Sequence, residues 1–163
     1  MLPRPRRPAR RRGFTLLELV IVVTTMGLLA AVAVPRLTGV VTTRRVTAAA
    51  ERVAADLRYA RAYARATGTP VTVGFDEEIG RYTLVDVPPP VGSGGDYSVE
   101  LGETPYGCVL ELTVVPAASD LTFDAYGLPV SAGTSWRIEV SEGSTVGRVD
   151  VDVTTGETTV TTP

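Results

Sequence analysis

The sequence changes character at Gly13-Phe14-Thr15-Leu16-Leu17-Glu18, where an arginine-rich head meets a long apolar run. Six arginines precede Gly13, whereas Phe14–Val34 has Glu18 as its only charge. A helix of this length measures about 31 Å at ~1.5 Å per residue, which matches the hydrocarbon core of a bilayer. The run is therefore predicted to span a membrane once, with the arginine-rich end in the cytoplasm and the rest of the chain outside.

Glu18 is the unusual residue of this run. An ionisable residue inside a membrane helix costs about 2.5–3.5 kcal/mol on insertion scales. A carboxylate in the first turn of a helix gains only about 0.3–1 kcal/mol from the helix dipole. The difference predicts a partner for Glu18 outside its own helix.

Two ordinary export signals also begin with a basic head and an apolar run. A secretory signal would use Ala31-Val32-Ala33 as its cleavage site, but its apolar stretch has only about 7–15 residues. Arg11-Arg12-Gly13-Phe14-Thr15-Leu16 loosely resembles a twin-arginine signal. Neither alternative accounts for Glu18.

The stretch from Gly13 to Glu18 resembles the prepilin cleavage and methylation motif of type IV pilins and type II secretion pseudopilins. The resemblance implies that a prepilin peptidase and methyltransferase removes residues 1–13 as a leader, cutting after Gly13. Phe14 then becomes the N-methylated N-terminus, and residues 14–42 remain as a stem anchored in the inner membrane. It further implies that Glu18 pairs with the Phe14 amino group of a neighbouring filament subunit.

Composition argues against an enzyme. The chain has no histidine, so a general base near neutral pH would need a carboxylate with a strongly shifted pKa. Asp150 and Asp152 are expected to lie on a solvated strand face, because a calcium site needs about 6–8 oxygen ligands. No metal and no cofactor are expected, and the single cysteine, Cys108, is predicted to be a small buried apolar residue.

Helical periodicity continues beyond the membrane run and predicts a second helical segment at residues 43–67. Thr67-Gly68-Thr69-Pro70 is a stop signal for this helix. Asp56 is placed off its apolar stripe, among the charged residues. Pro35 is expected to kink the stem, because it lacks an amide hydrogen and clashes with the preceding turn; an incidental kink at the membrane exit is the alternative. The stripe recurs at steps of four and three and comprises Val46, Ala50, Val53, Leu57, Ala60 and Ala64.

Beyond Pro70 the apolar period changes to two, which predicts antiparallel strands over residues 70–162. A long helix followed by five to seven such strands is an α+β layout, in which the helical stripe covers one face of the sheet. The loops Val87–Gly107 and Asp124–Thr134 are expected to present the partner-specific surface of this domain, residues 43–163. The predicted strands are Val71–Phe75, Arg81–Val85, Cys108–Val115, Leu121–Phe123, Ser135–Val140, Val146–Val153 and Glu157–Thr161.

Three further stretches resemble the GspH/FimT branch of this family, namely the helix segment Ala54–Ala64, the turn Leu121–Gly127 and Thr155-Gly156. The resemblance implies a pilin-like fold with a periplasmic globular domain. It also implies a minor pseudopilin that helps to initiate or cap a type II secretion filament of pseudopilins. The alternative is a FimT-like minor pilin of a type IV pilus, which serves pilus biogenesis or DNA uptake.

Some FimT-like pilins bind DNA, and in that family DNA binding is associated with arginines in the C-terminal region. The charge balance of this chain argues against such a role. From Phe14 onward, ten arginines face eighteen carboxylates, a net charge of 10 − 18 = −8. An acidic body is a poor match for the phosphate backbone. Only Arg137 and Arg148 follow Arg81 in the sequence, so they are the candidates for weak DNA contacts, and nucleic acid is not an expected partner.

Overall fold

The computed structural model describes residues 13–91, 95–115, 120–130 and 135–163, without the side chains of residues 32–38, 112–115 and 135. The chain divides into two compact units, Met1–Gly39 and Val40–Pro163. The predicted leader lies outside the described residues except for Gly13. The helix α1 (Leu16–Thr67) contributes to both units, which are described separately below.

In the first unit, Thr15 caps the start of α1. The Glu18 amide donates a hydrogen bond to Thr15 Oγ1 at 3.2 Å, so Thr15 satisfies one of the free amides of the first turn. The helix therefore begins at Leu16, two residues after the start of the predicted apolar run. Among the residues that the structure describes, no helical segment has both the length and the apolarity needed to cross a membrane.

Pro35 lies within α1, but the structure does not describe its side chain. The predicted kink at this residue therefore remains a prediction.

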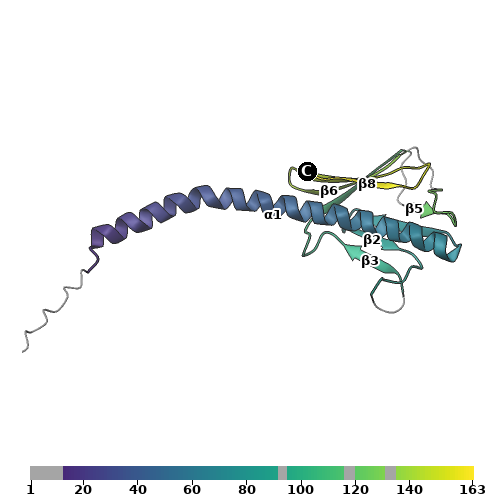
Figure 1. Ribbon diagram of the computed structural model, residues 1–163, viewed down its shortest axis with the longest axis horizontal. Helices are drawn as coiled ribbons and strands as arrows, with labels where there is room; N and C mark the ends of the chain where they lie inside the picture. Colours follow the sequence, from purple (N-terminus) through teal and green to yellow (C-terminus); the bar gives the residue numbers. More distant parts are fainter. Residues whose placement is uncertain (1–12, 92–94, 116–119, 131–134) are drawn as a thin grey trace, which may run out of the picture. The chain divides into compact units, whose positions relative to one another are not determined.

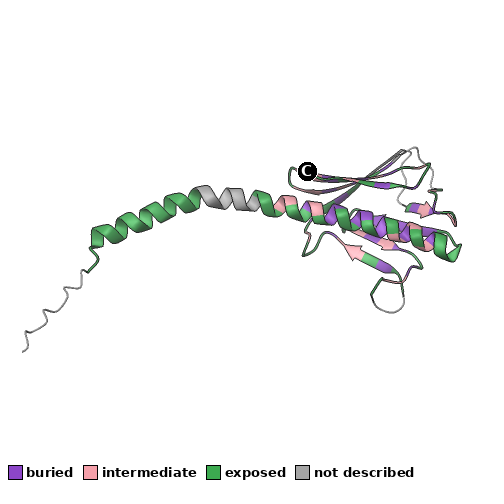
Figure 2. Ribbon diagram, in the orientation of Figure 1, coloured by how far each residue is buried: buried purple, intermediate pink, exposed green. Residues whose placement is uncertain are grey.

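In the second unit, α1 buries the predicted apolar stripe. All six of its residues are buried, and Ala49 and Ala54 widen it (Figure 2). The predicted end of the helix is confirmed: the Gly68 amide donates to the Ala64 carbonyl at 2.9 Å, and Gly68 has a φ of 68°. Glycine adopts this left-handed conformation without steric cost. Pro70, two residues later, has no amide hydrogen and cannot continue the helical hydrogen-bond pattern, so the helix ends here.

The strands form two antiparallel four-stranded sheets, with orders β3-β2-β1-β5 and β4-β6-β7-β8 (Figure 1). In the first sheet, residue 73 of β1 pairs with Leu84 of β2 and with Leu121 of β5. The first sheet contains β1 (Val71–Asp76), β2 (Arg81–Leu84), β3 (Tyr97–Glu100) and β5 (Asp120–Phe123). The second contains β4 (Val109–Val115), β6 (Ser135–Glu142), β7 (Thr145–Val151) and β8 (Thr158–Thr161).

The α+β class is confirmed, but two details of the predicted layout are wrong. The described residues contain eight strands rather than five to seven, because β3 lies inside the segment Val87–Gly107 that was predicted as a loop. The strands also divide between two sheets, so the helix has two sheets to cover. Short strands such as β3 give too few alternating residues for a period-two pattern to stand out.

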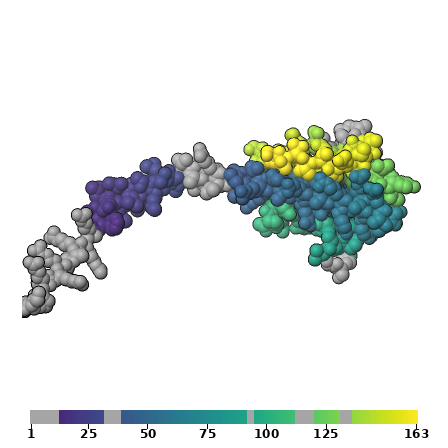
Figure 3. All heavy atoms as spheres, in the orientation of Figure 1, coloured from purple at the N-terminus to yellow at the C-terminus, as the bar shows by residue number. Residues whose placement is uncertain are grey.

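The second half of α1 runs between the two sheets, with β2 and β3 on one side and β6 and β8 on the other (Figures 1 and 3). A Cβ atom added to Gly147 of β7 would lie 3.1 Å from both Ala50 Cβ and Val46 Cγ1, so glycine permits this close approach of helix and strand. The two sheets meet where the rings of Phe75 and Trp136 lie 6.4 Å apart. The core is thus continuous from one sheet through the helix to the other.

Candidate functional site

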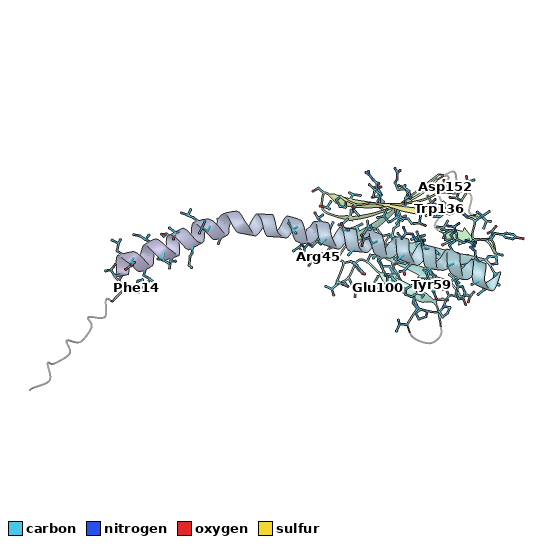
Figure 4. The ribbon with its side chains drawn as sticks, in the orientation of Figure 1. Phe14, Arg45, Tyr59, Glu100, Trp136 and Asp152 are labelled. Carbon is cyan, nitrogen blue, oxygen red and sulfur yellow. The ribbon has the colours of Figure 1, made fainter. Side chains whose placement is uncertain are left out.

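The predicted processing and assembly residues lie at the start of α1 (Figure 4). Phe14 is 83% exposed, Glu18 is exposed, and a Cβ atom at Gly13 would have no neighbour within 4 Å. The described apolar side chains of the following turns, from Leu16 to Leu29, are exposed as well. Gly13, Phe14 and Glu18 are therefore accessible in the single chain, and Glu18 forms no ion pair with another residue that the structure describes.

The two candidate DNA contacts are neutralised on the outer face of the second sheet. Arg137 Nε donates to Asp150 Oδ1 at 2.8 Å, and Arg148 Nε donates to Glu139 Oε1 at 2.8 Å. Both pairs join residues that stand opposite each other across β6 and β7. The hydrogen bond to Asp150 raises the pKa of Arg137. Each arginine is thus already paired with a carboxylate in the absence of DNA.

The two aspartates that sequence places on one strand face do not act together. β7 ends at Val151, so Asp152 lies in the following turn. Its Oδ1 accepts the amides of Thr155 and Thr154 at 2.8 Å, and these bonds lower the pKa of Asp152. Within the described part of the chain, no group of three potential ligands is arranged to hold a metal ion.

Cys108 is 1% exposed, as predicted for a small buried residue. Burial raises the pKa of its thiol, and Glu142 adds to this effect. A thiol held in its neutral form is a poor nucleophile, so the environment of Cys108 suits packing rather than chemistry.

A buried polar cluster joins α1 to the first sheet. Asp56 of α1 is 5% exposed, and its Oδ2 accepts the Tyr82 hydroxyl at 2.5 Å. The Tyr97 hydroxyl donates to both Asp56 oxygens at 3.1 Å, and Arg52 Nε donates to Oδ2 at 2.9 Å. Arg52 also donates to the Tyr97 hydroxyl. We call Arg52, Asp56, Tyr82 and Tyr97 the Asp56 cluster.

The electrostatics of the Asp56 cluster follow from its burial. Burial raises the pKa of Tyr82 above its ordinary value, and the negative charge of Asp56 raises it further. The same two causes raise the pKa of Tyr97. Burial lowers the pKa of Arg52, but the Asp56 carboxylate and the Tyr97 hydroxyl together outweigh that effect and raise it overall. The cluster therefore holds both tyrosines neutral as donors and Arg52 charged.

The placement of Asp56 off the apolar stripe is wrong. A second helical row, Ala49, Val53, Asp56 and Ala60, follows the same steps of four and three, and the structure buries all four. The row was recognisable in the sequence, but an aspartate in a row of apolar residues reads as an interruption. Its partners, Tyr82 and Tyr97, lie 26 and 41 residues away in the sequence.

The three stretches that resemble the GspH/FimT branch meet around Arg61. Arg61 Nε donates to the Gly127 carbonyl at 3.1 Å, and its Nη2 donates to the Thr155 carbonyl at 2.6 Å. Gly127 has a φ of 76°, and a Cβ atom there would lie 2.9 Å from Arg61 Cγ. A Cβ atom at Gly156 would lie 2.6 Å from the Gly127 carbonyl oxygen. These glycines let two loops approach one arginine of α1.

Two family models match the chain. Residues 49–156 match the model described as type II transport protein GspH, and residues 8–34 match the prokaryotic N-terminal methylation motif. The type II secretion system protein H of Xanthomonas campestris pv. campestris is 32% identical over 146 residues, which are 90% of this chain and 80% of that protein. The first match contains Arg61, Gly127 and Gly156, and the second contains Gly13, Phe14 and Glu18.

Solved structures of minor pilins and pseudopilins share the fold. The minor pseudopilin EpsH from the type 2 secretion system of Vibrio cholerae superimposes with a TM-score of 0.56 at 17% identity, over 73% of this chain and 98% of that chain. The type IV minor pilin FimU of Pseudomonas aeruginosa PAO1 gives a TM-score of 0.53 at 15% identity, over 71% and 91%. At these identities the likeness shows the fold.

Proposed function

The chain belongs to the GspH family of type II transport proteins, and from this we propose that it is a minor pseudopilin that helps to initiate or cap a type II secretion filament. The observation that carries the proposal is the match over residues 49–156 together with the methylation motif at residues 8–34. The likeness to FimU extends to the fold only, so a type IV pilus role has no comparable support.

The assembly mechanism that we propose begins at the exposed end of α1. A prepilin peptidase removes the leader after Gly13 and methylates Phe14. The apolar run anchors the chain in the inner membrane, with the second unit on the periplasmic side. Exposed apolar side chains around the first turns of α1 support this, because a helix that is apolar on all sides needs lipid or other helices around it.

In this mechanism Glu18 pairs with the Phe14 amino group of a neighbouring subunit. The support is that the Glu18 carboxylate is exposed and forms no ion pair with another described residue, while only its backbone amide is engaged by Thr15. A charge pair formed as subunits leave the bilayer offsets the cost of keeping a carboxylate among apolar residues. Pro35 lies in the stem, which packs against the stems of neighbouring subunits in this mechanism. Because proline has no amide hydrogen, the stem helix lacks one backbone hydrogen bond there.

A Glu18→Val variant tests the assembly role. We expect it to be processed normally but to enter filaments about tenfold less, which corresponds to about 1.4 kcal/mol of lost interaction. The measurement is the yield of chemical cross-links between this chain and the other pseudopilins expressed with it. Mass spectrometry of the mature N-terminus verifies that cleavage after Gly13 still occurs.

Thr15→Val is the matched control, because it removes the hydroxyl that caps α1 and keeps the carboxylate. If Glu18 served only to start the helix, both variants would lose cross-links to a similar extent. Undiminished cross-linking of processed Glu18→Val would contradict the proposed pair.

A further inference from the structure

A groove of about 400 Å³ lies at the beginning of the second unit, between α1 and the segment that precedes β4. Four of its residues present mainly carbon atoms, and two are arginines on the same stretch of helix. The lining residues are Val41, Arg44, Arg45, Ala48, Pro105 and Tyr106.

The groove is positively charged in a body that is otherwise acidic. Arg44 is exposed and has no ion pair or hydrogen bond within the described residues. Arg45, labelled in Figure 4, is 47% exposed and reaches Glu142 only at 3.3 Å. None of the described residues that line the groove is acidic. An anion entering it would meet one free guanidinium and a second that is only weakly paired.

The surroundings of the groove suit an amphiphile rather than a small inorganic anion. Val40 and Val41 are 51% and 47% exposed on the helix, and Tyr106 is partly exposed. Arginine and tyrosine side chains, each with an apolar body and a polar end, are favoured at the boundary between lipid and water.

Chain length keeps this groove close to the proposed anchor. Val41 follows Val34, the end of the apolar run, by seven residues, and even a fully extended chain of that length spans only about 25 Å. This bound holds whatever conformation the intervening residues adopt.

We propose that the groove binds the headgroup of an anionic phospholipid at the outer surface of the inner membrane. Arg44 and Arg45 contact the phosphate, and Val41, Pro105 and Tyr106 lie against the glycerol and upper acyl region. The proposal rests on the membrane anchoring in the proposed function. It adds a second, charge-dependent contact with the bilayer that would hold the globular unit at the membrane before assembly.

The test uses the full chain reconstituted into vesicles, with an environment-sensitive fluorophore at Thr104→Cys, beside the groove, in a Cys108→Ser background. We expect a blue shift in vesicles containing phosphatidylglycerol and none in pure phosphatidylcholine. Arg44→Gln/Arg45→Gln should lose most of the shift. Arg137→Gln/Arg148→Gln, which removes the same charge from the second sheet, should keep it.

Flotation of the vesicles separates this proposal from the anchoring itself. If the chain floats but the shift is equal in both lipids, or survives Arg44→Gln/Arg45→Gln, the groove does not bind anionic lipid. If the shift appears only when other pseudopilins are reconstituted together with the chain, the groove binds protein and the lipid proposal is wrong. If the chain does not float, the anchoring is wrong and the groove proposal falls with it.

Discussion

Asp56 shows at the scale of one residue how a polar side chain is accommodated in this core. A buried carboxylate without partners would be very costly, yet Asp56 accepts bonds from two tyrosine hydroxyls and one guanidinium. Each partner comes from a different place: the preceding turn of α1, β2 and β3. The Asp56 cluster therefore fixes the position of α1 along the first sheet more specifically than apolar contacts alone.

Replacing Asp56 by alanine should destabilise the protein strongly. The change leaves the hydroxyls of Tyr82 and Tyr97 without their acceptor, and an unsatisfied buried group costs about 1–3 kcal/mol. We expect a loss of about 2–4 kcal/mol in the free energy of unfolding. The measurement is chemical unfolding of the chain in detergent solution.

The control for this prediction is Glu51→Ala, which removes an exposed carboxylate from the same helix and should change stability by less than about 0.5 kcal/mol. Equal losses in the two variants would show that the Asp56 cluster contributes no more than a surface charge.

At the scale of elements, arginines in the last turns of α1 form hydrogen bonds with segments that are distant in sequence. Arg58 Nη2 donates to the Thr158 carbonyl at 2.9 Å, and Arg61 holds the carbonyls of Gly127 and Thr155. The carbonyl groups of Gly127 and Thr155 in the loops and of Thr158 at the start of β8 need donors, and the helix supplies them through long side chains. The loop after β5 and the turn before β8 are thereby tied to one helix face.

Gly127→Ala should be markedly more destabilising than Gly143→Ala. Both glycines have a positive φ, 76° and 64°, so both variants incur about 1–2 kcal/mol of backbone strain. Only at Gly127 would the new methyl group lie within 3 Å of the Arg61 and Arg65 side chains, whereas nothing lies within 4 Å at Gly143. We expect an additional loss of about 1–3 kcal/mol at Gly127.

Thermal unfolding of both variants and of Gly127→Ala/Arg61→Ala measures this difference. If the clash with Arg61 contributes, Gly127→Ala should cost less when added to Arg61→Ala, which already lacks the Arg61 hydrogen bonds, than when added to the unaltered chain. Equal melting temperatures for Gly127→Ala and Gly143→Ala would mean that only the backbone conformation matters.

At the scale of the whole molecule, charge is distributed unevenly over the surface. The chain from Phe14 onward carries a net charge of −8, and its second sheet pairs Arg137 and Arg148 with carboxylates. Within the second unit, the groove at Arg44 and Arg45 is a local exception to this acidic character. An acidic surface with paired arginines repels DNA, and a short basic groove next to the stem suits a single anionic headgroup.

We therefore expect no salt-sensitive binding of duplex DNA by this chain. The measurement is an electrophoretic mobility shift at about 50 mM salt, where phosphate contacts are strongest. Glu139→Gln/Asp150→Asn frees both arginines and should bind DNA more strongly than the unaltered chain. Binding by the unaltered chain that disappears with Arg137→Gln/Arg148→Gln would overturn the expectation.

Much of the protein follows from its sequence because the signals are local. The apolar stripe of α1, its end at Gly68 and most strand positions depend on neighbours within one or two turns or along one strand. The motif from Gly13 to Glu18 is likewise a contiguous stretch, and it was enough to indicate the family.

Only the tertiary structure decided what depends on residues far apart in the chain. The burial of Asp56, the division of the strands into two sheets, the meeting of Gly127 and Gly156 at Arg61, and the pairing of Arg137 and Arg148 with carboxylates all belong to this class. The sequence shows whether a side chain is polar, but tertiary packing determines which residue it contacts. Local periodicity determines which face a residue occupies, and the closing of the core determines what that face meets.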